Sequence, residues 1–443
     1  MSGPRQVVIT GVGPITAFGA GMEPLWSALE EGRTGIAPIT AFDASGFRSR
    51  FAAFVPVERF DPRNAVPKSY RKAAKVMSRD IELAVGAAAA AIADAGLVTR
   101  GIDPEATPTI APDRMGCHIG AGLIAAEVDE LTAALAASTN PDGSLSLARW
   151  GESGMQNLTP LWMLKYLPNM LACHVTIIHD CQGPSNTITC AEASGGLSIG
   201  ESMRVIERGD ADACLSGGAE SKLNPMGLLR QQFAGRIGAA GEGADPARLV
   251  RPYSSDADGT VVGEGGGILV LEAAETARAR GRRPLATVAG FGAAQAAASD
   301  GAGVRLDPAG EEVSAAIERA LANAGVRAEE VDAIAPFASG IPAVDAVERS
   351  GLARVFGDRL ARIPLITVVP NVGDCAAGSG AISIALAATS LARQRLPRRI
   401  NAGVVEGLDA GAAPGRDVPL RAVVATSVGL GGQVAAVVLR RIA

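Results

Sequence analysis

One acidic side chain lies where enzymes commonly place a nucleophile. Residues 187–197 run from a β-branched stretch through a small-residue turn into a polar helix start. This pattern predicts a buried strand, a sharp turn and a helix N-terminus, with Glu192 at the turn. A helix N-terminus stabilises an anion, so we expect Glu192 to be held there as a carboxylate. Such a carboxylate could act as a general base, assist a decarboxylation or fill the pocket structurally.

The elements that position this turn alternate between strands and helices. Strands are expected at residues 7–13, 115–120, 211–217, 267–271, 288–292, 332–336, 365–369 and 437–440. Helices are expected at residues 22–32, 69–96, 311–325 and up to 395. Alternation of this kind implies layered, largely buried sheets with helices on their faces. Residues 288–292 echo residues 7–13, which hints at a duplicated unit.

Composition restricts the class of protein. The chain has 443 residues, 48% of them hydrophobic, and a net charge of -5, so nucleic acid is not an expected partner. The six cysteines form no CxxC pair and no metal-ligand spacing, and we expect reduced core residues and no metal. Neither a signal peptide nor a long apolar run is found, which favours a cytoplasmic protein.

Several motifs, taken in order, resemble one family. They are Val7–Gly13, Gly183–Ser185 with Ser194–Gly195, Gly209–Ala213 with Gly217–Glu220, Arg251–Pro252, Asp258–Gly259 with Gly263–Gly265, and Gly429–Gly432. Their order and spacing resemble the β-ketoacyl synthases, the condensing enzymes of the thiolase fold. The resemblance implies an α/β fold, a thiolase-like layered αβαβα sandwich of two similar halves, residues 1–255 and 256–443.

The sequence departs from this family where the family does its chemistry. The nucleophilic Cys of the family corresponds to Glu192, and its two catalytic His residues correspond to Phe337 and Asp374. The family Lys five residues before the second His corresponds to Val369. A thioester needs a thiolate, and enolate stabilisation needs hydrogen-bond donors, which Glu192, Phe337 and Val369 do not supply. Asp374 could instead cap a helix or pair with a backbone group or a partner chain.

The distribution of histidines agrees with a degenerate site. The chain has three, His118, His174 and His179, and all precede Glu192. A two-His condensing site would need them in the C-terminal half. We therefore expect no confident catalytic residue, and interpret His174 and His179 as structural histidines beside an apolar strand.

The family also contains chain length factors, ketosynthase-like subunits that do not condense. The resemblance implies such a subunit, which pairs with an active ketosynthase through residues 187–190 and shapes the acyl tunnel. Tunnel candidates are Glu192, Met155, Met163 and Leu430, although both methionines also suit a core. No cofactor is expected, because the phosphopantetheine of an acyl carrier protein delivers the acyl chain.

A basic stretch is the candidate surface for that carrier protein. It comprises Lys68, Arg71, Lys72, Lys75 and Arg79. Such a stretch is usually a solvated helix face, but its charge could also steer an acidic carrier protein.

Two other functions stay open. One is a malonyl-carrier-protein decarboxylase that uses Glu192, and the other is a homodimeric acyl-binding protein. The sequence predicts neither the chain length nor the class of product.

Overall fold

The computed structural model describes residues 3–296, 306–400, 405 and 407–442. The strands are β1 Val7–Thr16, β2 Gly19–Ala20, β3 Ala37–Pro38, β4 Phe51–Ala52, β5 Met115–Gly120, β6 Ser185–Ile188, β7 Ala213–Glu220, β8 Gly265–Ala273, β9 Ala286–Gln295, β10 Ala333–Ala335, β11 Arg395–Leu396, β12 Arg416–Asp417, β13 Ala422–Val428 and β14 Gln433–Arg440. The helices are α1 Met22–Glu30, α2 Arg79–Ala95, α3 Val128–Ser138, α4 Leu147–Glu152, α5 Met170–His179, α6 Ser194–Glu207, α7 Pro225–Phe233, α8 Ala274–Ala279, α9 Glu311–Ala324, α10 Pro342–Phe356, α11 Val369–Val372 and α12 Ser379–Arg393.

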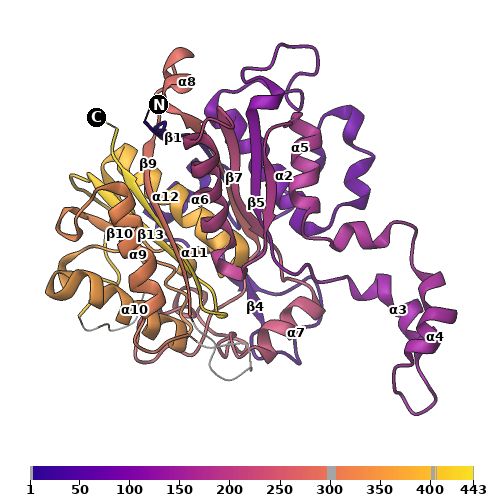
Figure 1. Ribbon diagram of the computed structural model, residues 1–443. Coiled ribbons are helices and arrows are strands. Elements are labelled where there is room, and N and C mark those ends of the chain that lie inside the picture. Colours follow the sequence, from indigo (N-terminus) through magenta and orange to yellow (C-terminus); the bar gives the residue numbers. More distant parts are fainter. Residues whose placement is uncertain (1–2, 297–305, 401–404, 406, 443) are drawn as a thin grey trace.

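The long strands join in one mixed sheet with the order β10-β13-β14-β9-β1-β8-β7-β5-β6. β1 pairs antiparallel with both β8 and β9, and so connects the early part of the sheet to the late part. Figure 1 shows helices α6 and α12 between these two parts, with α2 and α5 outside one and α9 and α10 outside the other. The protein therefore has five layers, as expected for a thiolase-like sandwich.

Strand side chains alternate between these layers. On β8, Ile268 and Val270 belong to the core beneath α2, whereas Leu269 and Leu271 belong to the central core. Successive residues of a strand face opposite sides of a sheet, so a strand covered on both faces is apolar throughout. This is why the buried strands have continuous apolar sequences.

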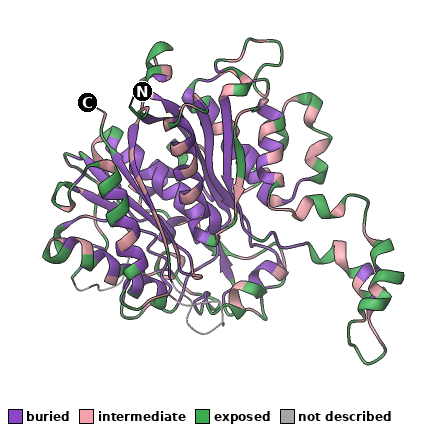
Figure 2. Ribbon diagram, in the orientation of Figure 1, coloured by how far each residue is buried: buried purple, intermediate pink, exposed green. Residues whose placement is uncertain are grey.

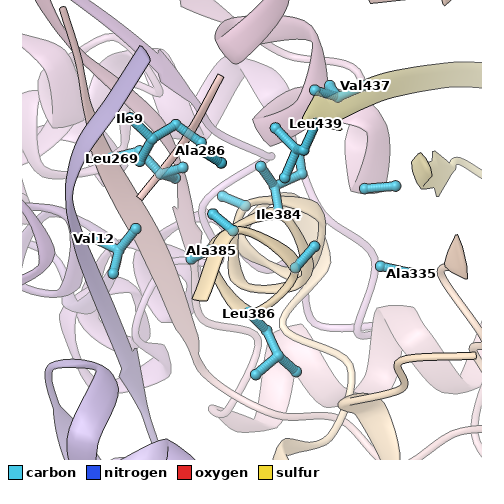
Figure 3. Close-up of a cluster of buried hydrophobic side chains, with 14 of the residues drawn as sticks. Ile9, Val12, Leu269, Ala286, Ala335, Ile384, Ala385, Leu386, Val437 and Leu439 are labelled. Atoms are coloured by element: carbon cyan, nitrogen blue, oxygen red, sulfur yellow. The ribbon is translucent and has the colours of Figure 1, made fainter. Parts of the chain in front are cut away.

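The central core surrounds α12. Figure 3 shows Ile384, Ala385 and Leu386 of α12 among side chains from strands of both parts, including Ile9 and Leu439. α12 is buried from Ser379 to Leu391. A helix that is apolar on all sides belongs in the interior, and its small residues let sheets approach from both sides.

Close packing of glycine against alanine repeats in the two halves. A Cβ atom on Gly13 would lie 2.2 Å from the Ala87 carbonyl oxygen in α2. A Cβ atom on Gly292 would lie 2.1 Å from the Ala316 carbonyl oxygen in α9. β1 on α2 and β9 on α9 are thus matching units, which confirms the predicted echo between residues 7–13 and 288–292.

Three predicted elements are wrong. No strand forms at residues 365–369, because Leu365 makes only an isolated bridge to Ile334 and Pro370 in the first turn favours the start of helix α11 at Val369. The helix expected at residues 69–96 starts only at Arg79, because Met77 is extended and residues 68–76 form two short 3₁₀ turns. His174 and His179 lie in helix α5, not beside a strand. The bulky apolar sequence of α5 fits either a helix or a strand, since a short apolar segment has no clear period.

The sheet ends at an open edge with a projecting arm beside it. β6 is the last strand, and its residues are exposed or half-buried, so the buried strand expected there is an edge strand. Residues 123–166, which include α3 and α4, extend away from the body (Figure 1). Figure 2 shows this arm to be mostly exposed or half-buried. Within the described part of the chain, no helix is long and apolar enough to cross a membrane.

Replacing Gly13 with Ala should lower stability by about 1–3 kcal/mol, because the new Cβ forces β1 away from α2. Urea-induced unfolding measures this loss. Gly241→Ala is the matched control, since no heavy atom lies within 4 Å of its added Cβ. Equal stability of the two variants would contradict the close-packing argument.

Candidate active site, filled by an ion cluster

The turn that carries Glu192 is built twice. Before α6, the backbone passes through Ala191 at φ 49°, and the Cys190 N–H donates to Ser194 Oγ at 2.8 Å. Before α12, the backbone passes through Ala376 at φ 46°, and the Cys375 N–H donates to Ser379 Oγ at 2.9 Å. Left-handed backbone is unfavourable for alanine and is often retained at functional sites.

Arg236 holds Glu192 in this turn. Glu192 is 1% exposed, and its Oε1 accepts a hydrogen bond from Arg236 Nη2. The same nitrogen donates to Asp374 Oδ2 at 3.0 Å. Leu430 N–H lies 3.4 Å from the other Glu192 oxygen. The structure thus confirms a buried carboxylate at the turn, but a guanidinium partners it in place of helix N–H groups.

The three charges of this cluster depend on one another. Burial by itself lowers the pKa of Arg236, but Glu192 and Asp374 raise it above its ordinary value. Burial raises the pKa of Asp374, and Arg236 opposes this only in part. One buried cation between two carboxylates compensates charges that would otherwise be costly to bury.

Asp374 also shapes the second turn. Its Oδ1 accepts from the Ala376 N–H at 2.9 Å and from Ser379 Oγ at 3.1 Å. At 4% exposed, it is not a solvated loop residue. The hypothesis that Asp374 pairs with a backbone group is therefore confirmed, whereas neither the 3₁₀ turn Ala376–Gly378 nor α12 has a side-chain N-cap. The ion pair with Arg236 adds a role that was not foreseen.

A second buried ion pair lies next to the cluster. Glu220, at the end of β7, pairs with Lys222 and accepts from the Ala377 N–H at 2.9 Å. Lys222 also donates to the Leu123 carbonyl at 2.6 Å. Both pairs line a pocket of about 340 Å³ whose rim includes the exposed residues Leu123 and Thr189.

Phe337 and Val369 are buried away from this pocket. The Phe337 N–H donates to Glu348 Oε1 at 2.8 Å, and the same oxygen accepts from Thr426 Oγ1 at 2.7 Å. Val369 is 1% exposed and starts the short helix α11. Neither lines the pocket, so of the four degenerate positions the structure brings together Glu192 and Asp374.

The two methionine candidates are not in a core or at the pocket. Met155 is 53% exposed and Met163 is 61% exposed, both on the projecting arm. Their apolar character suited a buried segment, but the described residues leave more than half of each methionine exposed. Leu430 is half-buried and contacts Glu192 through its backbone N–H, so it does lie at the site.

The basic stretch divides into free and paired residues. Lys68, Arg71, Lys72 and Lys75 are exposed in the short turns before α2. Arg79 pairs with Glu264 at 2.8 Å and Glu82 at 3.1 Å, so it is a structural residue and not a docking cation. Its partner Glu264 lies 185 residues away, so the sequence does not show that the two side chains meet.

The histidines and cysteines have structural roles. His174 Nδ1 lies 2.9 Å from Tyr70 Oη, and His179 Nδ1 lies 2.8 Å from Thr99 Oγ1, which confirms structural histidines. All six cysteines are unpaired. The described residues contain no cluster of three or more His, Cys, Asp or Glu suited to a metal.

Sequence reasoning missed Arg236 and Lys222. Neither belongs to a recognisable motif, and Arg236 lies in a Gly-rich segment that reads as a loop. The available signal was indirect, because a buried carboxylate at Glu192 requires a cation.

Replacing Arg236 with Met should destabilise the fold by about 3–5 kcal/mol at pH 7, because it leaves two carboxylates buried together. Burial already raises the pKa of Asp374, and without Arg236 this pKa would lie further above that of the unfolded chain. The folded state would bind more protons, so stability should fall as pH rises from about 4 to 7. Urea unfolding at several pH values measures this.

The control for this variant is the triple substitution Arg236→Met, Glu192→Gln and Asp374→Asn, which removes all three charges. It should recover most of the lost stability and show no such pH dependence. An Arg236→Met loss below about 1 kcal/mol, unchanged by pH, would argue against the ion cluster.

Comparison with known proteins places this chain in a family. Residues 4–277 match the β-ketoacyl synthase N-terminal domain and residues 285–403 match its C-terminal domain. The chain is 30% identical to the 3-oxoacyl-[acyl-carrier-protein] synthase 2 of Vibrio harveyi, covering 99% of both proteins. The chain is also 30% identical to the 3-oxoacyl-[acyl-carrier-protein] synthase 2 of Coxiella burnetii, covering 99% of both proteins.

Solved structures agree with the sequence match. The ishigamide ketosynthase/chain length factor superimposes with a TM-score of 0.81 at 26% identity, covering 99% of this chain and 100% of that one. A β-ketoacyl synthase from Burkholderia phymatum gives 0.82 at 26% identity, with the same coverage. With its layered sandwich, its doubled turn and these matches along its length, the chain belongs to the β-ketoacyl synthase family.

Proposed function

We propose that this protein is a non-condensing ketosynthase subunit of the chain-length-factor type, which pairs with an active ketosynthase. The observation that carries the proposal is the Glu192–Arg236–Asp374 cluster at the nucleophile turn. The family has a thiolate and a histidine at positions 192 and 374. This chain has a cluster of three charged side chains there, which stabilise one another. The partner would supply the Cys and both His residues, and acyl chains would arrive on the phosphopantetheine of a carrier protein.

The cluster also argues against a decarboxylase that uses Glu192. A general base needs a carboxylate free to reach substrate. Glu192 is 1% exposed and is engaged by Arg236 and by the Leu430 N–H. This arrangement suits a structural plug better than a base.

The surface beside the site supports pairing. β6 leaves one edge without a neighbouring strand. The arm next to it exposes eight large apolar side chains: Leu123, Val128, Leu145, Leu147, Met155, Leu161, Met163 and Leu164. An unpaired edge and a large apolar surface are liabilities in a monomer, and a partner of the same fold would cover both. Such a partner would also close the pocket at its Leu123–Thr189 rim.

Co-expression with a ketosynthase of this family that has an intact Cys and two His should yield a heterodimer by native mass spectrometry. Met163→Asp should weaken the dimer at least about tenfold, because it places a charge in an apolar interface. Ile102→Asp is the matched control, since Ile102 is 51% exposed but lies outside the arm.

Two results would contradict the proposal. A homodimer that refuses every ketosynthase offered would favour an acyl-binding protein. Release of carbon dioxide from malonyl-carrier protein by the purified chain, abolished by Glu192→Ala, would establish the decarboxylase.

A second prediction concerns the carrier protein. The relatives from Vibrio and Coxiella are both named 3-oxoacyl-[acyl-carrier-protein] synthase 2. We propose that Lys68, Arg71, Lys72 and Lys75 receive an acidic carrier protein here. The double variant Lys68→Glu, Lys72→Glu should slow carrier association about tenfold at low salt, measured by stopped flow. The control double variant Arg278→Glu, Arg440→Glu changes the net charge by the same amount and should not slow carrier association. Equal slowing by both double variants would mean that net charge alone causes the effect.

A further inference from the structure

A second pocket lies at the opposite end of the sheet from the ion cluster. It has a volume of about 740 Å³ and is lined by the starts of β1 and β9, by α8 and by the end of β14. Glu220 at the candidate site pairs with Gly265, whereas Val7 in this pocket pairs with Ala273. Eight residues of β8 separate these ends, or about 25 Å. The pocket is therefore independent of the candidate site.

Arginine dominates the charge of this pocket. Its lining contains five arginines, Arg5, Arg278, Arg282, Arg440 and Arg441, against one acidic residue, Glu207. Glu207 is already paired with Arg204, at 2.8 Å. The whole chain carries a net charge of -5, so this concentration of positive charge goes against the overall balance.

Three of the five guanidinium groups have no ion-pair partner among the described residues. Arg278 and Arg440 are exposed, and no described side chain bonds to either, while Arg441 donates only to the Gln394 amide at 3.2 Å. The other two are structural. Arg5 pairs with Asp212 at 2.9 Å and Glu275 at 2.5 Å, and Arg282 donates to the Thr10 carbonyl at 2.8 Å.

We propose that this pocket binds the oligophosphate group of a small ligand. Guanidinium groups match phosphate oxygens with paired, charge-assisted hydrogen bonds. A volume of about 740 Å³ is in the range of small-molecule sites. Pro4, Pro284 and Ile442 add an apolar wall against which an organic group could pack. The free guanidinium groups come from different elements, α8 and the C-terminal end of β14, so they surround a ligand from two sides.

Isothermal titration of the full-length chain with pyrophosphate tests the proposal. We expect saturable binding, which the double variant Arg278→Gln, Arg440→Gln weakens about 100-fold, or about tenfold for each lost charged contact. Lys68→Gln with Lys72→Gln removes the same two charges at the other basic cluster and should leave binding unchanged. Unfolding temperatures of both variants verify that they fold.

Titrations with AMP and ATP at matched ionic strength distinguish the sources of the phosphate. Tighter binding of ATP than of pyrophosphate would support a nucleotide site, and equal binding would support recognition of the oligophosphate alone. Absence of saturable binding up to millimolar pyrophosphate would overturn the proposal. So would equal weakening by the arginine and lysine pairs, because net charge would then account for it. The result does not depend on pairing with a ketosynthase.

Discussion

The buried central layer is the constraint on which the structure depends. Helices α6 and α12 lie between the two parts of the sheet, so both contain many small residues. α12 is buried from Ser379 to Leu391, whereas α6 also carries the charged residues Glu201, Arg204 and Glu207. Each starts from the same turn, in which an alanine adopts a left-handed conformation and a serine hydroxyl accepts the preceding cysteine N–H. This geometry places the side chain at 192 in a site enclosed by both halves.

A charge buried in such a site is costly unless an opposite charge lies beside it. A glutamate at the turn could persist only with a cation beside it, and Arg236 is that cation. Asp374 completes the cluster from the second turn, where it also accepts from the Ala376 N–H and the Ser379 hydroxyl. Electrostatic complementarity thus stabilises the doubled turn inside the family scaffold. Among the described residues, the sheet ends at the open edge of β6, and an arm with exposed apolar side chains lies beside it.

The sequence was most informative where local pattern and interior position agree. Apolar runs located the strands, and the glycines of residues 7–13 and 288–292 marked the matching contacts with α2 and α9. It was misleading at residues 69–78, where helix-forming residues precede an extended Met77. It also failed for Met155 and Met163, because an apolar side chain does not reveal whether its own chain or a partner covers it.

The sequence by itself determined what this protein lacks. Position 192 carries a carboxylate in place of a thiol and no histidine follows Glu192, and both facts are independent of folding. Only the tertiary structure decided what replaces them. Arg236 is 44 residues from Glu192 and 138 from Asp374, and it lies in a loop without periodicity. Long-range ion pairs of this kind leave no local pattern, since the contact depends on how the sheet and loops bring distant segments together.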